Sequence, residues 1–263
     1  MKLNKLINKS YYSSVGYISN ENDLNTLESY ILYNLPVLKH FKGHIVVTNY
    51  SKDLREENTQ LWRKYFPDCI LMDLEVNRGH SFGIADQENE IIEYCHKNNI
   101  DWILKTSHDV IFQMKILDIE IPTSDFYYMN GIGYGGMAKY DFDLERVENE
   151  DFYPQTNFYF IDTSKVDYLY DRAYVDETYG YIHSLTNYNG RIWEYIEGWT
   201  CEDFLKQCVE RNNLSKYHLV SPKTYRRLLE TVKRNVIHDC SHKNIMIDGI
   251  CHYQYLNSPV MGI

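Results

Sequence analysis

Short apolar segments and amphipathic helices alternate along the first part of the chain, and this alternation constrains the fold more than any other feature. Segments typical of buried strands occupy residues 14–19, 44–48, 69–72 and 101–105. Apolar residues recur at helical spacing between them, and we expect Asn22 or Asp23 to cap the first helix. Strands joined through single helices run parallel and are covered on both faces. The sequence therefore predicts an α/β fold with a mixed, mainly parallel sheet.

Polar residues follow each of the four predicted strands. They are Ser19-Asn20, Asn49-Tyr50, Asn77-Arg78-Gly79 and Ser107-His108-Asp109. Ligands of open parallel sheets bind beyond the carboxyl ends of the strands, so these residues are the first candidates for a binding site. The sequence has neither G-x-G-x-x-G nor G-x-x-x-x-G-K-[ST], which weighs against dinucleotide oxidoreductases and P-loop enzymes.

The second part of the chain is less regular. Residues 125–129 and 157–161 are typical of strands, and a glycine-rich loop that contains Tyr134 lies between them. A further helix is expected to begin within residues 198–203. Because no repeat or flexible linker separates the parts, we expect residues 1–263 to form a single domain with halves 1–124 and 125–263.

Composition excludes several classes of protein. The net charge of −10 argues against an overall nucleic-acid surface, although residues 223–234 are locally basic. The six cysteines include no C-x-x-C pair, which is typical of a reducing compartment. No signal peptide is evident, and no stretch approaches the ~20 apolar residues of a membrane span. We therefore expect a cytoplasmic protein. The 25 tyrosines suit stacking on sugars or bases, but a biased AT-rich coding sequence is the simpler explanation of their number.

The first candidate site is Lys105-Thr106-Ser107-His108-Asp109, at the end of a predicted buried strand. A carboxylate here can bridge to a diphosphate through a divalent cation, and a simple turn cap is the structural alternative. The order of elements resembles that of GT-A-fold glycosyltransferases, whose Asp-x-Asp motif follows a strand at this place. The resemblance implies that Asp109 binds Mn²⁺ or Mg²⁺, whereas Ser107 stands where the family has its first aspartate.

The same resemblance implies a donor site for a nucleotide sugar, most simply a UDP-sugar. Asn77-Arg78-Gly79 is similar to the family's donor-side segment. The residues expected at the donor are Ser19, Asn20, Asn77, Arg78, Lys105, Ser107 and His108. The resemblance thus makes residues 1–124 the half that binds the nucleotide sugar.

The second candidate site is Gly198-Trp199-Thr200-Cys201-Glu202-Asp203. It resembles the Trp-Gly-x-Glu-Asp segment of inverting GT-A enzymes such as the β-1,4-galactosyltransferases, with Thr200 in place of the second glycine. The resemblance implies that Asp203 is the general base, that Glu202 binds the acceptor hydroxyl and that Trp199 stacks on the acceptor. We place Tyr134 on the same acceptor side. Thr200 and Asp203 also have the spacing of a capping box, so capping and catalysis are expected together.

The third candidate site lies near the C-terminus. Three histidines, His238, His242 and His252, follow both earlier segments. They resemble the late histidine that completes the family's metal site. We expect His238 to be the ligand, with His242 and His252 as substitutes.

Together these segments predict a metal-dependent, inverting glycosyltransferase whose acceptor is a glycan or glycoconjugate. A hydroxylated DNA base is an alternative acceptor that the net charge does not favour. A non-catalytic protein that binds nucleotide sugars is the alternative from another class, because the first aspartate of the metal motif is missing. A nucleotidyltransferase is a weaker alternative, since it would leave residues 199–203 without a role.

Overall fold

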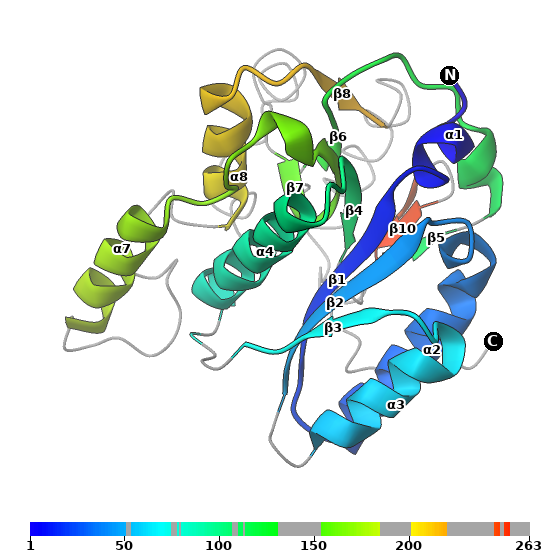
Figure 1. Ribbon diagram of the computed structural model, residues 1–263, viewed down its shortest axis with the longest axis horizontal. Helices are drawn as coiled ribbons and strands as arrows, with labels where there is room; N and C mark the ends of the chain where they lie inside the picture. Colours follow the sequence, from blue (N-terminus) through cyan, green and yellow to red (C-terminus); the bar gives the residue numbers. More distant parts are fainter. Residues whose placement is uncertain are drawn as a thin grey trace, which may run out of the picture.

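The computed structural model in Figure 1 has a twisted central sheet with helices on both sides. The structure describes residues 1–50, 54–74, 78, 80–106, 110–112, 114–130, 154–184, 201–219, 245–247 and 250–252.

The central sheet has seven strands in the order β3-β2-β1-β4-β7-β6-β8. Their bounds are β1 (Tyr11–Ile18), β2 (Gly43–Tyr50), β3 (Ile70–Met72), β4 (Trp102–Thr106), β6 (Phe126–Asn130), β7 (Pro154–Asp162) and β8 (Lys216–His218). Strands β3, β2, β1 and β4 run parallel, and so do β6 and β8. Strand β7 is antiparallel to both of its neighbours, β4 and β6. The predicted mixed, mainly parallel sheet is confirmed.

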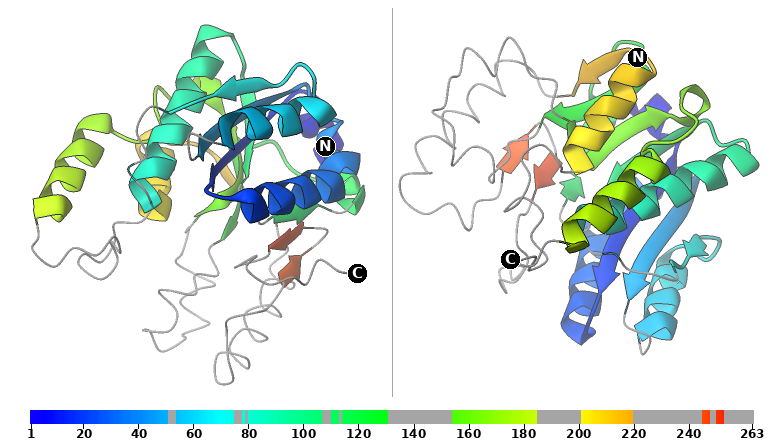
Figure 2. Two further views of the ribbon diagram at one scale, coloured as in Figure 1. Left: turned by 90° about the horizontal axis from the view of Figure 1, so that it is seen from below. Right: turned by 90° about the vertical axis from the view of Figure 1, so that its left-hand side faces the viewer.

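A second, three-stranded sheet joins segments that lie far apart in the sequence. It consists of β5 (Val110–Phe112), β10 (Ile250–His252) and β9 (Ile245–Ile247), in that order and all antiparallel. Figure 2 shows β9 and β10 below the main sheet. This sheet returns the end of the chain to the residues that immediately follow β4.

The helices separate into two layers, one on each face of the main sheet (Figures 1 and 2). Their bounds are α1 (Leu3–Ile7), α2 (Glu21–Leu38), α3 (Arg55–Tyr65), α4 (His80–Lys97), α7 (Arg172–Ser184) and α8 (Cys201–Arg211), with short 3-10 turns η2 (Met114–Asp118) and η3 (Thr163–Lys165). Helices α1, α2 and α3 contribute to one apolar core, and α4, α7 and α8 contribute to the other. The predicted coverage of both faces is therefore confirmed.

Alternating side chains of the central strands supply both cores. On β2, Val46 packs into the core beneath α2 and α3, whereas Ile45 and Val47 pack into the core beneath α4. On β4, Leu104 faces the first core and Ile103 the second. A two-residue period that is apolar on both sides is what a strand buried between two helical layers requires.

The N-cap of helix α2 lies two residues before Asn22 and three before Asp23, the predicted caps. Its N-cap is Asn20, whose side-chain oxygen accepts a hydrogen bond from the backbone N–H of Asp23 at 3.1 Å. The Asp23 carboxylate in turn accepts from the backbone N–H of Ser19 at 2.8 Å. The prediction of Asn22 or Asp23 as the cap was wrong, because the extended backbone that a cap needs occurs at Asn20.

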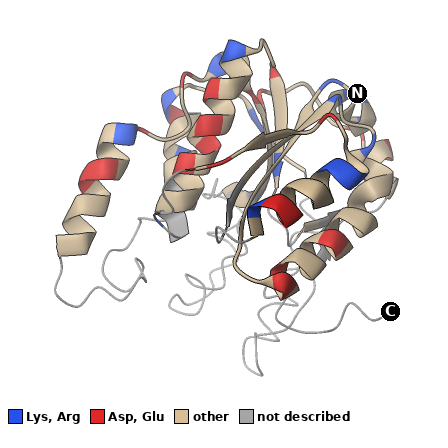
Figure 3. Ribbon diagram, turned by 60° about the horizontal axis from the view of Figure 1, so that its bottom comes forward, with Lys and Arg blue, Asp and Glu red and all other residues tan. Residues whose placement is uncertain are grey.

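Charged residues occur mostly on the helices and near their ends, as the colours of the ribbon in Figure 3 show. No helix in the described part of the chain has the length and apolar character needed to cross a membrane. The cysteines whose side chains are described, Cys69, Cys95, Cys201 and Cys208, are all buried free thiols.

Candidate active site

The predicted site residues divide into those the structure describes and those it does not. Outside the described residues lie Asn77, Ser107, His108, Asp109, Tyr134, Trp199, His238 and His242. Asp203 lies in α8 and His252 in β10, and only their backbone is described. The side chains of Ser19, Asn20, Arg78, Lys105 and Glu202 are described in full.

Helix α2 holds the residues on both sides of the 107–109 segment. The hydroxyl of Thr106, the last residue of β4, lies 3.0 Å from the Tyr30 hydroxyl and donates to the Tyr12 hydroxyl at 2.9 Å. The backbone oxygen of Val110, the first residue of β5, accepts a hydrogen bond from the side-chain amide of Asn34 at 3.0 Å. All of these groups are buried, so the entry to the predicted metal motif and the exit from it are both fixed.

The small sheet brings the C-terminal segment next to the same motif. In the antiparallel pairing of β10 with β5, His252 is the partner of Val110. Position 252 is thereby placed beside the residue that follows Asp109. Of the three candidate histidines, His252 is the one whose backbone the structure places.

Strand β7 carries the first turn of α8 to the carboxyl end of β4. In the antiparallel register Thr106 pairs with Phe158, so Thr156 lies on β7 beyond the last paired residue of β4. The Thr156 hydroxyl donates a hydrogen bond to Oε1 of Glu202 at 3.0 Å, and the Cys201 thiol donates to Oε2 at 3.3 Å. The predicted acceptor-side carboxylate at 202 therefore lies at the same sheet edge as the end of β4.

Lys105 is not open to solvent but lies in a buried polar cluster. Its Nζ lies 2.8 Å from Oε1 of Glu88 on α4, and the two side chains are 1% and 0% exposed. The same ammonium donates to the backbone oxygen of Thr156. Oε2 of Glu88 accepts hydrogen bonds from the hydroxyls of Tyr159 at 2.6 Å and Tyr170 at 2.5 Å. Opposite charges and phenolic donors thus satisfy one another where water is excluded.

The environment keeps the donors of this cluster protonated. Burial, together with the negative charge of Glu88, raises the pKa of Tyr159 and of Tyr170 well above the ordinary value. Burial, together with the charge of Glu202, raises the pKa of the Cys201 thiol well above its ordinary value. Cys201 is therefore held as a thiol, the form that donates to Glu202.

Ser19 and Asn20 lie at the carboxyl end of β1 and are exposed there. Their side chains form the cap of α2, since the Ser19 hydroxyl donates to Asp23 at 2.5 Å and the Asn20 amide donates to Ser19 at 2.8 Å. Their position agrees with the predicted donor edge of the sheet. Their part in donor binding stays a prediction.

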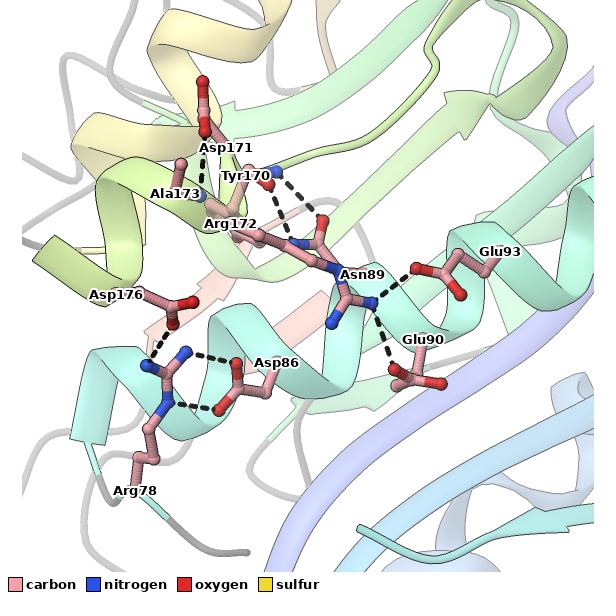
Figure 4. A network of polar contacts seen from close by, with 10 residues as sticks. All are labelled: Arg78, Asp86, Asn89, Glu90, Glu93, Tyr170, Asp171, Arg172, Ala173 and Asp176. Atoms are coloured by element: carbon pink, nitrogen blue, oxygen red, sulfur yellow. Dashed lines mark hydrogen bonds and ion pairs between the residues drawn. The ribbon is translucent and has the colours of Figure 1, made fainter. Parts of the chain in front are cut away.

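Arg78 joins two helices, as Figure 4 shows. Its Nε and Nη2 donate to the carboxylate of Asp86 on α4 at 2.8 and 2.5 Å, and its Nη1 donates to Asp176 on α7 at 2.6 Å. Nearby, the side chain of Asn89 donates to the backbone oxygen of Tyr170 at 2.8 Å. These contacts fix the residues before α7, and α7 itself, against α4. The hydrogen bonds that Arg78 donates to Asp86, together with the charge of that carboxylate, help to raise the pKa of Arg78.

Sequence reasoning did not find Glu88, Thr156 or Asn34. Glu88 shares an apolar helical stripe with Ala85, Ile92 and Cys95, and a carboxylate within such a stripe is a signal of a buried partner. Thr156 and Asn34 carry no comparable signal, because both residue types are common on surfaces.

No family model matches the sequence, and no curated protein matches it. Among solved structures, the galactosyltransferase LgtC in complex with donor and acceptor sugar analogues aligns with a TM-score of 0.53 and 10% identity, over 94% of this chain and 87% of that chain. Mouse xyloside xylosyltransferase 1 aligns with a TM-score of 0.46 and 12% identity, over 95% and 99% of the two chains. A nucleotide-diphospho-sugar transferase from Desulfovibrio desulfuricans G20 aligns with a TM-score of 0.45 and 8% identity, over 80% and 79%.

At these identities the likeness concerns the arrangement of helices and strands. It rests on the galactosyltransferase structure, whose alignment has a TM-score of 0.53. The chain therefore has the GT-A-like fold that the order of its sequence segments predicted.

Proposed function

We propose that this protein is a glycosyltransferase that moves a sugar from a nucleotide-sugar donor to an acceptor hydroxyl. The observation that carries the proposal is the hydrogen bond between Thr156 and Glu202, which brings the first turn of α8 to the carboxyl end of β4. Donor-side and acceptor-side segments, nearly 100 positions apart by their numbering, thus meet at one edge of a GT-A-like sheet. Ligands of such sheets bind at that edge.

Asp203 is the proposed general base of an inverting transfer. Its carboxylate accepts the proton of the acceptor hydroxyl while the hydroxyl oxygen forms a bond to the anomeric carbon. The bond from that carbon to the diphosphate oxygen breaks at the same time, so the nucleoside diphosphate leaves with the electron pair. A helix N-terminus holds a carboxylate in its ionised form but makes it a weaker base, and burial beside Trp199 is proposed to offset this effect.

Glu202 is proposed to bind and orient the acceptor hydroxyl. Each of its oxygens accepts one hydrogen bond, from Thr156 or from Cys201, and each retains further lone-pair capacity. Its carboxylate is therefore held in place before an acceptor arrives. Trp199 and Tyr134 complete the proposed acceptor side as stacking surfaces.

The proposed ligands of Mn²⁺ or Mg²⁺ are Asp109 and a C-terminal histidine. His238 is the expectation from the sequence, and the pairing of His252 with Val110 favours His252 as its substitute. Carboxylate oxygen with imidazole nitrogen is a donor set that suits Mn²⁺ well. No group of three potential ligands occurs within the described residues, to which Asp109 and His238 do not belong. A bound cation would offset the charge of the leaving diphosphate.

The donor is proposed to lie along the ends of β1 and β4 and the segment before α4. Ser19, Asn20 and Arg78 are the described residues of this set. A UDP-sugar is the proposed donor class, and a glycan or glycoconjugate is the proposed acceptor.

A binding and turnover screen tests the proposal. Purified protein is heated with each nucleoside diphosphate and nucleotide sugar, with and without Mn²⁺, and the melting temperature is recorded. A true donor should raise the melting temperature, since it binds the native state. The same donor is then incubated with glycan acceptors and with hydroxymethylated DNA, and the released nucleoside diphosphate is measured. Donor binding without release under any condition would favour a non-catalytic binding protein.

A further inference from the structure

A continuous chain of polar contacts, most of them buried, connects β4 with the first turn of α8. It runs from the hydroxyls of Tyr159 and Tyr170 to Glu88, and from Glu88 to Lys105 on β4. Lys105 then donates to the backbone oxygen of Thr156 on β7. The hydroxyl of that same threonine donates to Glu202. Four elements, α4, β4, β7 and α8, are thereby joined through side chains at one level of the core.

The links up to Thr156 are shielded from water, and the last one, to Glu202, is partly buried. Lys105 is 1% exposed, Glu88 1% and Thr156 4%. A lysine so deeply buried is out of reach of a ligand at the sheet edge. The Lys105 ammonium is linked to Glu202 at the sheet edge through Thr156. The backbone oxygen of Thr156 accepts a hydrogen bond from Lys105, and its hydroxyl donates one to Glu202.

The hydrophobic effect alone does not explain the cluster. Replacing a buried ion pair by apolar side chains of similar volume is often neutral or stabilising, so such a pair is weak evidence for stability. A directional network, in contrast, fixes side-chain positions to within a hydrogen-bond length. Fixed positions matter most where a carboxylate must meet a reacting hydroxyl, since small misplacements there cost large factors in rate.

We propose that Lys105 and Glu88 are positioning residues that act through Thr156 on Glu202. The pair anchors β7 at Thr156, Thr156 holds the carboxylate of Glu202, and the first turn of α8 is thereby set against the end of β4. The expected effect on the transfer rate rests on the proposed function. The expected effect on the position of α8 rests on the described contacts alone.

The variant Thr156→Val tests the link with least disturbance, because it removes the hydroxyl and keeps the volume and the backbone oxygen. Thr156→Ser restores a hydroxyl. Thr178→Val is the matched control, since Thr178 is equally buried and its hydroxyl donates to Tyr174 within α7. Lys105→Met and Glu88→Gln test the pair itself.

Two readouts separate positioning from folding. Hydrogen exchange is compared over α8, where Thr156→Val, Lys105→Met and Glu88→Gln should each accelerate exchange and Thr178→Val should not. In the transfer assay, Thr156→Val should lower kcat by about 10–100-fold with the donor KM within about twofold, and Thr156→Ser should recover most of the rate.

The two readouts also separate this inference from the proposed function. If the wild-type protein transfers no sugar from any donor, the proposed function fails, and the exchange data still decide whether the chain of contacts positions α8. Exchange in α8 that is unchanged in Thr156→Val and in Lys105→Met would overturn the inference. So would a rise in donor KM at constant kcat, because the residues would then act on donor binding.

Discussion

The ammonium of Lys105 lies 2.8 Å from the carboxylate of Glu88, and neither side chain is more than 1% exposed. Lys105 belongs to the strand that leads into the predicted metal motif, and Glu88 belongs to the helix that covers that strand. The pair therefore connects a central strand of the sheet with a helix of the layer formed by α4, α7 and α8.

Removing the ammonium should destabilise the protein strongly. Lys105→Met leaves the Glu88 carboxylate buried without a counter-charge, so the free energy of unfolding should fall by about 3–5 kcal/mol. Lys105→Met combined with Glu88→Gln should recover part of this loss, since no unpaired charge remains and Tyr159 and Tyr170 keep an acceptor. Urea denaturation of both variants measures the difference. A double variant no more stable than Lys105→Met would exclude the buried charge as the cause.

Asp203→Asn should abolish sugar transfer while donor binding persists. The amide cannot take the acceptor proton, and a general base typically contributes about 10²–10⁴-fold to the rate. Glu210→Gln is the matched control, because Glu210 is an exposed carboxylate near the end of the same helix. Transfer rates and donor-induced melting shifts are measured for both. An Asp203→Asn protein with wild-type turnover would remove Asp203 as the base.

Asn34→Leu should weaken the attachment of α2 to β5, the strand that follows the predicted metal motif. The backbone oxygen of Val110 loses a buried hydrogen bond, and the expected loss in unfolding free energy is about 1–3 kcal/mol. The melting shift produced by donor with Mn²⁺ should also shrink relative to the wild-type shift. Asn25→Leu, an exposed position on the same helix, is the control. Equal effects of the two substitutions would contradict a specific role for Asn34.

The two carboxylates that pair with Arg78 should differ in importance. Asp86 receives two hydrogen bonds from the guanidinium and is 22% exposed, whereas Asp176 receives one and is 66% exposed. Asp86→Asn should therefore lower the melting temperature more than Asp176→Asn does. The exposed ion pair between Arg78 and Asp176 should contribute at most about 1 kcal/mol to the free energy of unfolding. High salt should reduce the effect at Asp176. The reverse order would indicate that α7 depends mainly on the Asp176 contact.

Acid should destabilise the protein through His44. This ring stacks on Phe66 at 3.8 Å between centroids, and burial lowers its pKa from 6.5 to about 4. The unfolded chain binds a proton on this residue at a higher pH than the native protein does. The contribution of neutral His44 is therefore complete above about pH 6.5 and is lost as the pH falls to about 4.

The size of this effect follows from the same shift. The loss in unfolding free energy should be on the order of 3 kcal/mol, because one pKa unit corresponds to about 1.4 kcal/mol. Denaturation curves of the wild type and of His44→Phe between pH 7.5 and 4.5 measure it. The variant should show a shallower fall with pH, and parallel curves would assign the acid sensitivity to other groups.

The long elements could be predicted from the sequence because their burial leaves a regular pattern. Helices α2, α3 and α4 and strands β1, β2 and β4 each bury a face, and the spacing of apolar residues reveals that face. The strands of the small sheet, in contrast, have three residues each, too few for any period. Their pairing depends on contacts between residues about 140 positions apart by their numbering, which no local pattern records.

The sequence pointed to the segments that make up the candidate site, but not to the buried residues that hold them in position. Glu202 lies at the expected sheet edge, whereas Lys105 was expected at the donor and is buried against Glu88. Each member of that pair interrupts an apolar pattern, Lys105 within a fully buried strand and Glu88 within the apolar stripe of α4. Opposite charges on two facing apolar surfaces are the signal from which their contact could have been predicted.

The hydrogen bonds from α2 to Thr106 and Val110 have an evolutionary consequence. Tyr30 and Asn34, which make these contacts, are four positions apart on one helix, so a single helical turn sets the span between the two anchoring points. Side chains at 107, 108 and 109 can then be exchanged while the chain still enters and leaves at the same places. The ends of β4 and β5 would therefore stay in place when the residue types of the predicted metal motif change.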